Sequence, residues 1–370
     1  MRIALVVHDF SRAFGHGRYV VELATRFARE HDVHVFANTF SDDAPGVHRH
    51  HVPTWRASAL TTILSFYPSA TLRLRGHFDI VHAQGFSVAG ANMVTAHISN
   101  KRWMAARREL CGGRLPWRER LFGALVTPLE RRAMASPGAT VIAVSQALQR
   151  ELVADGVPGR IVVIPHGVDE QQFNTAVVER YRRDVRHELG CADDETLFLF
   201  VGDLRKGFAR AIEALVSTPG RLVAVTRSDA SESMSLARQL GVADRVMVRP
   251  ATPRIERYYA AADAFVFPTQ YDAFGMVITE AMACGRPVIT TAAAGASDLI
   301  QHGRTGFVVA DPADVGALTG QMRALAANAA LREAVGRAAA DAMQAHSWNR
   351  VASQTMAAYE QRAGAGPSVP

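Results

Sequence analysis

The chain has 370 residues, of which 48% are hydrophobic and 21% are charged, and its formal net charge is +6 with a pI near 9.6. This length exceeds what one hydrophobic core usually organises, so we expect two domains, and the composition excludes wholesale disorder and fibrous repeats. The positive charge favours an anionic partner, a class that includes nucleic acid, phospholipid headgroups and phosphorylated small molecules.

No targeting or membrane-spanning segment is expected. The first apolar run covers only residues 3–7 and is followed by Asp9, which predicts a buried strand rather than a signal peptide. No run approaches the roughly 20 apolar residues of a spanning helix, so any membrane contact would be peripheral. Cys111, Cys191 and Cys284 lack CxxC spacing and nearby paired histidines, which argues against a disulfide framework or a zinc site. We therefore expect a cytoplasmic protein, with peripheral contact limited to the inner face of the membrane.

Short apolar runs alternate with amphipathic stretches through the first half of the chain. Runs typical of buried strands occur at 2–7, 32–37, 79–84, 93–98 and 140–145. Helical spacing of apolar residues occurs at 19–30 and 146–156. This alternation predicts a parallel sheet covered by helices.

The pattern is interrupted and then restarts, which predicts a domain boundary near Gly167. A charged, strand-poor stretch covers 177–196, and strand–helix alternation resumes at 197–216. Further strand-like runs occur at 222–226, 245–248, 264–268, 287–291 and 306–310, and a helix at 275–285 is ended by Gly285.

We therefore expect an α/β protein with two doubly wound, Rossmann-like domains, residues 1–167 and 168–347. A helix over about 348–362 is expected to pack back on the first domain, and the last few residues are expected to fray. In open parallel sheets, ligands bind beyond the carboxyl ends of the strands, so two facing domains would create a cleft lined by strand-to-helix loops.

Two carboxylates stand eight residues apart around the start of one predicted helix. A strand ends at Pro268, Asp272 lies in the loop that follows, and Glu280 lies two turns into the next helix. Backbone amides at the helix start would face the same spot as Asp272 and suit phosphate or sugar oxygens: those of Phe274, Gly275, Met276 and Val277. A nucleotide sugar needs both kinds of contact. Alternatively, Asp272 only caps the helix and Glu280 pairs with an arginine.

Two cations, Arg205 and Lys206, stand in a glycine-flanked loop between a predicted strand and helix. They are well placed to neutralise a diphosphate. The sequence contains no Asp-x-Asp pair, the arrangement by which many sugar transferases hold a divalent ion on the diphosphate. We therefore predict a reaction without a metal ion or other cofactor. The alternative is an ordinary exposed basic turn.

Together these segments resemble the signature of the family 4 glycosyltransferases of the GT-B fold, whose motif is Glu-x7-Glu, with Asp272 in place of the first acid. The resemblance spans nearly the whole chain, because further segments occur in the expected order: FGHGRYVVELA, DIVHAQG, VTAHI, VIAVS, IPHGVD, RKG and TGFVV. The resemblance implies two Rossmann-like domains facing across a cleft. The chain is similar to bacterial enzymes that build lipopolysaccharide cores and lipid-linked saccharides.

The resemblance also implies roles for individual residues. Glu280 would hydrogen-bond the donor ribose and Asp272 would lie beside the transferred sugar. Arg205 and Lys206 would stabilise the departing diphosphate, which is electrostatic catalysis. The family transfers sugar with retention of anomeric configuration, through attack of the acceptor from the leaving-group side, with a phosphate oxygen taking the proton.

In the first domain, the resemblance implies that His97 lies near the sugar and the reacting carbon. The loop from Gly15 to Gly17 would approach the donor phosphates, since glycine permits close approach. Without the resemblance, those glycines indicate a tight turn before a helix. A hydrogen-bonded histidine at a strand end is the alternative for both His97 and His82.

The chain departs from the family pattern at three positions. Besides Asp272, Asp298 stands where a glutamate is usual, and His166 replaces the common asparagine of IPNGVD. A shorter aspartate would loosen contacts at the sugar, so the donor sugar remains open. The donor class expected from the resemblance is a UDP-hexose or a UDP-N-acetylhexosamine. The acceptor implied is a saccharide or glycolipid of lipopolysaccharide or another cell-envelope glycan.

Residues 101–132 combine positive charge with large apolar side chains. They contain nine Lys and Arg against three Glu. Interleaved with these charges are Trp103, Trp117, Leu121, Phe122 and Leu125. This composition is typical of a segment that rests on anionic lipid, and the alternative is a solvated helical face beside a core.

Three other functions compete with sugar transfer. A GT-B-type nucleotide-sugar 2-epimerase would use the same donor cleft but would need groups that move protons. A noncatalytic protein that binds nucleotides or nucleic acid would fit the basic pI, although no nucleic-acid partner is expected. A nicotinamide dehydrogenase is disfavoured, because no GxGxxG follows the first strand.

Overall fold

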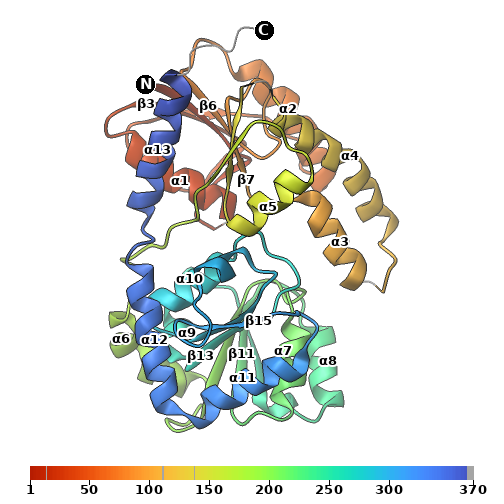
Figure 1. The fold of residues 1–370 in the computed structure, drawn as a ribbon, viewed down its shortest axis with the longest axis vertical. Coiled ribbons are helices and arrows are strands. Elements are labelled where there is room, and N and C mark those ends of the chain that lie inside the picture. Colours follow the sequence, from red (N-terminus) through yellow and green to blue (C-terminus); the bar gives the residue numbers. More distant parts are fainter. Residues whose placement is uncertain (14, 111, 137, 365–370) are drawn as a thin grey trace. The chain divides into compact units, whose positions relative to one another are not determined.

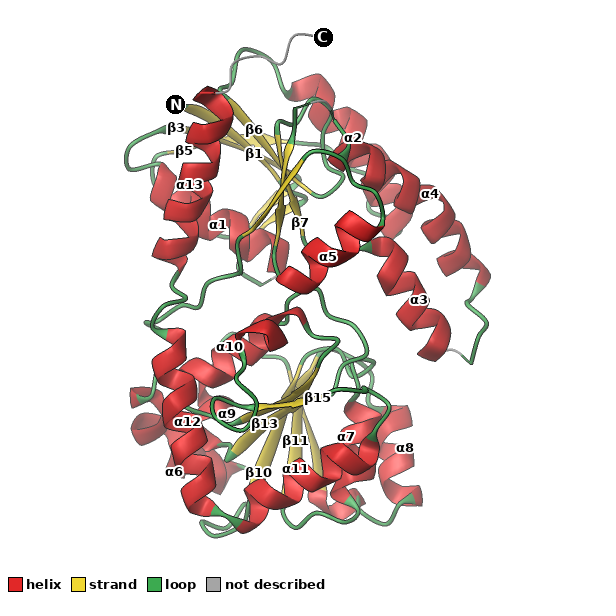
Figure 2. Ribbon diagram, in the orientation of Figure 1, coloured by secondary structure: helices red, strands yellow, loops and turns green. Residues whose placement is uncertain are grey.

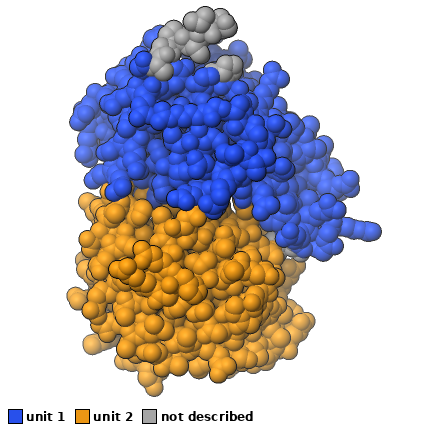
Figure 3. Space-filling model, viewed as in Figure 1, with its two compact units in different colours: residues 1–166, 348–370 blue, residues 167–347 orange. Residues whose placement is uncertain are grey.

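The computed structural model describes the chain except residues 14, 111, 137 and 365–370. It divides into two compact units, which we call unit 1 (Met1–His166 with Trp348–Pro370) and unit 2 (Gly167–Ser347) (Figure 3). The predicted boundary lay one residue further along the chain. Each unit is built on a parallel sheet, so the α/β fold with two doubly wound domains is confirmed (Figure 1).

The sheet of unit 1 has seven strands in the order β5-β3-β1-β6-β7-β8-β9, and every pairing is parallel. Its strands are β1 (Arg2–Val6), β3 (Asp32–Ala37), β5 (Val47–His51), β6 (Ile80–Gln84), β7 (Met93–Ala96), β8 (Thr140–Ala143) and β9 (Arg160–Val163). The central strands are buried on both faces, which is why they are continuous apolar runs. The edge strand β5 is polar, with the sequence VHRHH, and was not predicted.

Helices flank this sheet (Figure 2). They are α1 (Gly15–Phe27), α2 (Ala59–Arg73), α3 (Asn100–Leu110), α4 (Trp117–Met134), α5 (Gln146–Ala154) and α13 (Trp348–Gly364). A small parallel ladder joins β2 (Asp9–Phe10) to β4 (Thr39–Phe40). Helix α13 belongs to unit 1, where Arg26 Nε donates to Asn349 Oδ1 over 2.8 Å.

The sheet of unit 2 has six parallel strands in the order β12-β11-β10-β13-β14-β15. They are β10 (Leu197–Val201), β11 (Arg221–Thr226), β12 (Val246–Pro250), β13 (Ala264–Phe267), β14 (Val288–Thr291) and β15 (Phe307–Val309). The helices are α6 (Ala176–Glu188), α7 (Phe208–Leu215), α8 (Ser231–Gln239), α9 (Glu256–Ala261), α10 (Met276–Ala283), α11 (Val315–Ala327) and α12 (Ala329–Met343), with 3₁₀ turns η1 (Ala243–Arg245) and η2 (Gly295–Leu299).

The strand-poor stretch 177–196 is largely helix α6, and its arginines attach it to the sheet. Arg182 lies 2.6 Å and Arg186 3.0 Å from the two carboxylate oxygens of buried Asp263, which precedes β13. The same carboxylate accepts the backbone N–H of Leu197, the first residue of β10, over 2.8 Å. This network ties α6 to the amino-terminal ends of β10 and β13.

The order of strands reverses once in each sheet, between β1 and β6 in unit 1 and between β10 and β13 in unit 2. Loops leave such a point in opposite directions, and the crevice between them is the usual ligand site of a doubly wound sheet. Within the described residues, no helix combines the length and the apolar character needed to cross a membrane. Cys191 and Cys284 are buried free thiols, and Cys111 lies outside the described residues.

Candidate functional site

The strand order of unit 2 reverses between β10 and β13, and we call this position the switch point of unit 2. It brings Lys206 and Asp272 together. Lys206 lies in the loop after β10, and Asp272 lies in the loop after β13, the adjacent strand. The distance from Lys206 Nζ to Asp272 Oδ2 is 2.6 Å, and the two side chains are 31% and 15% exposed. Only Lys101 and Lys206 are lysines among the 41 basic Lys and Arg residues of the chain. A compact ammonium rather than a planar guanidinium therefore occupies this position.

Backbone hydrogen bonds fix Asp272 in place. Its N–H donates to Ala293 O over 3.1 Å, and its carbonyl oxygen accepts from Gly295 over 2.8 Å. Both partners follow β14, so the loops after two adjacent strands are joined here. The side-chain Oδ1 accepts the N–H of Phe274 over 3.2 Å. The carboxylate is thus held between Lys206 and the start of α10, while Asp298 in η2 is exposed.

Arg205 does not share the position of Lys206. Its Nη2 lies 2.6 Å from Asp203 Oδ2, and its Nε lies 3.1 Å and 3.0 Å from the two oxygens of the same carboxylate. Burial alone would raise the pKa of Asp203, but the hydrogen bonds and charge of Arg205 lower it below its ordinary value. The arginine is half-exposed, so the structure brings Lys206 to Asp272 and leaves Arg205 on Asp203.

Gly207 allows the two loops to approach each other. It precedes α7 with φ of +98°, a conformation that L side chains rarely adopt. A Cβ atom at this position would lie 2.6 Å from the carbonyl carbon of Pro268 at the end of β13. The glycine of the RKG segment is therefore required by the contact that places Lys206 beside the loop of Asp272.

Glu280 is buried in α10, and its partner was missed from the sequence. The hydroxyl of Tyr259 in α9 lies 3.0 Å from Glu280 Oε2 and 3.2 Å from Val277 O. Tyr259 is fully buried and Glu280 is 6% exposed. The pattern RYYAAADAF gives no functional signal, since helical spacing predicts only that one tyrosine faces the core. Neither interpretation of Glu280 from the sequence included Tyr259 as a partner of this oxygen.

The first turn of α10 follows Asp272 directly. Gly275 precedes the helix, and Met276 and Val277 occupy its first two positions, whose N–H groups have no acceptor within an α-helix. Such groups, together with the helix dipole, favour an anion or a sugar oxygen. Phe274 differs from the other three predicted amides, because its N–H is already used by Asp272.

A cavity of about 460 Å³ opens at the same edge of the sheet. It is lined by residues at the carboxyl ends of β11 and β12: Thr226, Arg227, Ser228, Val248, Arg249, Pro250 and Ala251. Its volume lies in the usual range for small-molecule sites. The strand order places this cavity, the loop of Lys206 and the loop of Asp272 in sequence along one edge, where three strand spacings span about 14 Å.

In unit 1, His97 follows β7 and offers one ring nitrogen to a ligand. Its Nε2 lies 2.8 Å from Gln84 Oε1, which assigns the proton to Nε2. The buried Nδ1 has no hydrogen-bond partner among the described residues. Burial lowers the pKa of His97 well below its ordinary value, and the charges of His16 and His166 act in the same direction. The imidazole is therefore neutral, with an acceptor at Nδ1.

The other histidines around His97 differ in role. His82 in β6 is fully buried, and its ring nitrogens lie 2.6 Å from Tyr359 Oη and 2.6 Å from Thr95 Oγ1. Burial lowers the pKa of His82 to about 3. His82 is therefore a hydrogen-bonded histidine at a strand end, as the alternative interpretation expected. His166 is also buried and stacks on His97 with ring centroids 5.3 Å apart. Burial lowers its pKa to about 3.

The glycines of the FGHGR segment lie at the start of α1. Gly15 is the first residue of the helix, and Phe14 lies outside the described residues. Gly17 is buried, and a Cβ atom there would lie 2.5 Å from Asp9 O. Its small size is therefore used to pack α1 against the loop after β1, at the switch point of unit 1.

Residues 101–132 form most of α3 and α4, two helices that lie side by side (Figure 1). Part of their predicted surface charge is internal. Glu130 is buried, and burial raises its pKa to about 7. Arg107 is buried too, with Nη2 2.9 Å from Glu119 Oε1.

An apolar row remains on the surface of α4. Trp117, Leu121 and Leu125 are spaced by four residues and are 68%, 45% and 41% exposed. Several exposed arginines of the segment have no salt bridge within the described part of the chain: Arg114, Arg118, Arg120, Arg131 and Arg132. Trp103 and Phe122 are half-buried, so only part of the predicted aromatic set faces solvent.

Two family models match the chain. The model for group 1 glycosyl transferases matches residues 182–342, and the model for glycosyltransferase family 4 matches residues 15–172. The D-inositol 3-phosphate glycosyltransferase of Actinosynnema mirum is 28% identical over 399 aligned residues, which cover 94% of this chain and 92% of that protein. The protein of the same name from Geodermatophilus obscurus is 29% identical, with 94% and 84% covered.

Solved structures share the fold. WaaG, a glycosyltransferase involved in lipopolysaccharide biosynthesis, superposes with a TM-score of 0.81 at 21% identity, covering 95% of this chain and 98% of that one. Anabaena Alr3699/HepE in complex with UDP-glucose superposes with a TM-score of 0.73 at 18% identity, covering 98% of this chain and 100% of that one.

Proposed function

Because this chain belongs to the family 4 glycosyltransferases of the GT-B fold and is a hexosyltransferase, we propose that it moves a hexose or an N-acetylhexosamine from a UDP-sugar to a saccharide or glycolipid acceptor. The transfer retains the anomeric configuration and uses neither a metal ion nor another cofactor. The observation that carries the proposal is the ammonium of Lys206 held 2.6 Å from Asp272 at the switch point of unit 2.

Lys206 stabilises the leaving group. As the bond between the sugar C1 and the β-phosphate oxygen breaks, its electron pair goes to that oxygen, and negative charge grows on the diphosphate. An ammonium already oriented by a carboxylate stabilises this charge without reorganising at that moment. The acceptor oxygen forms the new bond to C1 on the same face, and its proton passes to the departing phosphate oxygen.

Sugar and nucleotide contacts follow from the remaining groups. Asp272 keeps lone pairs for sugar hydroxyls, because each carboxylate oxygen can accept more than one hydrogen bond. His97 Nδ1 accepts from a sugar hydroxyl, as its neutral state requires. Buried Glu280, oriented by Tyr259, accepts from the ribose hydroxyls. The cavity between the ends of β11 and β12 receives the base.

The test measures release of nucleoside diphosphate from UDP-, GDP- and ADP-sugars with excess chelator and a membrane-lipid extract. We expect release from a UDP-sugar that survives chelation and collapses in Glu280→Ala and Lys206→Ala. Exposed Arg304→Ala and Glu333→Gln in unit 2 serve as matched charge controls. Proton NMR of the product reports whether the anomeric configuration is retained. Release that requires Mg²⁺ or Mn²⁺, or no donor binding by calorimetry, would contradict the proposal.

The two lysines allow a direct test of donor contact. A UDP-sugar should protect Lys206 from acylation, while exposed Lys101 reacts at an unchanged rate. Mass spectrometry of the labelled peptides reads both sites in one sample. Equal labelling of Lys206 with and without a saturating donor would remove it from the phosphate site.

We also propose that the row Trp117, Leu121 and Leu125 rests on an anionic membrane at the inner face, where a lipid-linked acceptor would be found. Three exposed apolar side chains on one helix face, flanked by exposed arginines that form no salt bridge among the described residues, combine apolar burial with attraction to anionic headgroups. We expect cosedimentation with phosphatidylglycerol vesicles that weakens with salt and in Trp117→Ala. Trp55→Ala is the matched control, since Trp55 is 67% exposed outside this segment. Equal binding by both variants would overturn the proposal.

The relatives favour a second acceptor class, a soluble polyol phosphate. D-inositol 3-phosphate glycosyltransferases align over nearly the full chain. The acceptor panel therefore includes a soluble polyol phosphate beside the lipid extract. Transfer to the polyol phosphate in the absence of lipid would assign the chain to that class.

A further inference from the structure

Strands β3 and β5 bring acidic and histidine side chains together at the edge of the sheet of unit 1. Asp32 and His34 lie two residues apart on β3, so their side chains share one face. In the parallel register, His48 of β5 is the direct partner of His34. The same face therefore carries Asp32, His34 and His48, with His50 two residues further along β5. The strand register places these side chains beside one another.

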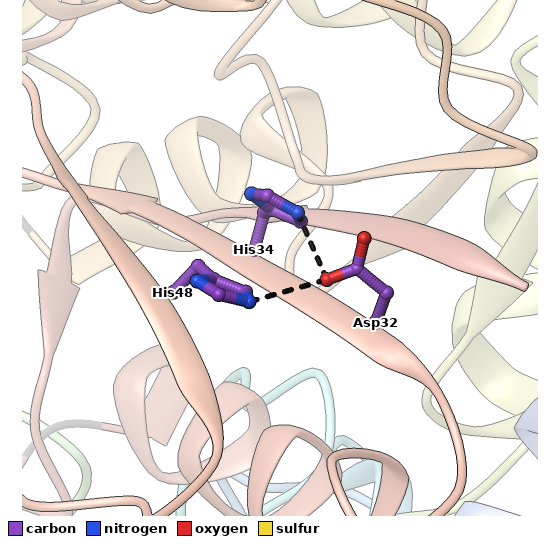
Figure 4. Close-up of side chains that lie close together, drawn as sticks. All are labelled: Asp32, His34 and His48. Carbon is purple, nitrogen blue, oxygen red and sulfur yellow. Dashed lines mark ion pairs between the residues drawn. The ribbon is translucent and has the colours of Figure 1, made fainter.

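The ligand atoms of this cluster converge (Figure 4). Asp32 Oδ1 lies 3.1 Å from His34 Nε2 and 3.4 Å from His48 Nε2. All three atoms lie within 4.8 Å of one another. Around a tetrahedral zinc ion, with bonds of about 2.0–2.1 Å, neighbouring ligand atoms are about 3.3 Å apart. The separations of 3.1 Å and 3.4 Å match that spacing.

Neighbouring groups prepare His34 and Asp32 as ligands. Arg2 Nε lies 3.4 Å from His34 Nε2, so this guanidinium would turn toward Asp32 when an ion takes the nitrogen lone pair. His34 Nδ1 lies 2.8 Å from His50 Nε2, so His50 can accept a proton held on Nδ1 while Nε2 binds the ion. Metal-binding histidines use this arrangement, with the second nitrogen donating to an outer partner. Asp32 Oδ2 faces Arg2 Nε at 3.3 Å, which leaves Oδ1 for an ion.

His34 Nε2 and Asp32 Oδ1 form an ion pair 3.1 Å apart in the metal-free protein. A divalent ion would take the place of the shared proton, because metal ligands must be deprotonated. Two imidazoles and one carboxylate suit zinc and neighbouring first-row divalent ions, whereas Mg²⁺ and Ca²⁺ prefer oxygen ligands alone.

We propose that Asp32, His34 and His48 bind one zinc-class divalent ion that ties the edge strand β5 to β3. The fourth position is open to water, since His48 is well exposed. Asp32 is the first residue of β3, so the ion lies toward the amino ends of the strands. The carboxyl ends carry the loop of His97 and its neighbours. The ion therefore supports the fold and takes no part in sugar transfer.

The experiment titrates Zn²⁺ alone into the full, metal-free chain without a polyhistidine tag, by calorimetry, with Mg²⁺ as the comparison. We expect one equivalent of Zn²⁺ and no heat with Mg²⁺. Asp32→Asn and His48→Ala should each weaken binding at least about tenfold. His51→Ala is the matched control, because His51 is exposed on the same strand but faces the other side.

A second readout covers variants that disturb folding. Co²⁺ bound by wild type should give the visible absorption of a tetrahedral site, which His48→Ala abolishes while circular dichroism stays unchanged. Zinc binding that is absent in wild type, or equal in wild type, Asp32→Asn and His48→Ala, overturns the proposal. Since the test needs no donor sugar, its outcome is independent of the transfer reaction.

Discussion

Lys206 Nζ lies 2.6 Å from Asp272 Oδ2, although 66 residues separate the two in the chain. The loops that carry them leave adjacent strands, β10 and β13, where the strand order of unit 2 reverses. Backbone hydrogen bonds on both sides hold Asp272 in place. The ion pair therefore fixes the position of the Lys206 ammonium.

Lys206→Ala should lower kcat/KM for transfer about 10²–10³-fold, the usual loss when one electrostatic stabiliser of a transition state is removed. Lys206→Arg should recover little of this, because a planar fork cannot reproduce a compact ammonium beside Asp272. Initial rates of diphosphate release measure both variants. Full activity in Lys206→Arg would show that charge alone matters at this position.

Tyr259→Phe should raise the KM for the donor about fivefold with little change in kcat. The variant removes the hydroxyl that orients Glu280, and a hydrogen bond of this kind contributes about 1 kcal/mol. Glu280→Gln should raise KM further, since it loses the charged acceptor itself. If Tyr259→Phe instead lowered stability and left KM unchanged, the hydroxyl would serve only the core.

Gly207→Ala should reduce the free energy of unfolding by about 2–4 kcal/mol, from a strained backbone and from overlap with Pro268. Gly241→Ala is the control, because Gly241 has φ of +71° but open space around it. That variant should lose only about 1–2 kcal/mol. Denaturant unfolding compares the two, and equal losses would contradict the close approach described for Gly207.

Glu130→Gln should remove a pH dependence of stability. Burial raises the pKa of Glu130 from 4.5 to about 7, and the charge of Asp155 adds to this, against hydrogen bonds from Asn100. Between these two pH values, the folded state holds a proton that the unfolded state has lost, so stability falls as pH rises. The wild type should lose on the order of 2–3 kcal/mol across pH 4.5–7.

Glutamine keeps an acceptor for the Asn100 N–H, which lies 3.1 Å from the present carboxylate. The wild type and Glu130→Gln should therefore be similar at pH 4.5, and the variant should be more stable at pH 8. Chemical denaturation across this range provides the comparison. A constant difference at every pH would mean that Glu130 stays ionised in the folded chain.

Much of the architecture follows from local patterns in the sequence. Continuous apolar runs such as 197–201 predict buried parallel strands, because only a sheet covered on both faces hides every side chain of a strand. The polar edge strand β5 escaped prediction, since VHRHH has no apolar alternation and is held by its pairing with β3. The burial of Glu130 was not predicted either, because a pattern of charged residues does not show which of them lose contact with water.

The sequence by itself determined the two α/β domains and the segments around Asp272, Glu280 and Lys206, because strand period, helix spacing and motif order are local properties. Tertiary structure alone decided which of these groups meet. It joined Lys206 to Asp272, left Arg205 on Asp203 and supplied Tyr259 to Glu280. Contacts between residues distant in the chain depend on strand order and on how closely loops approach. No short segment of sequence determines either of them.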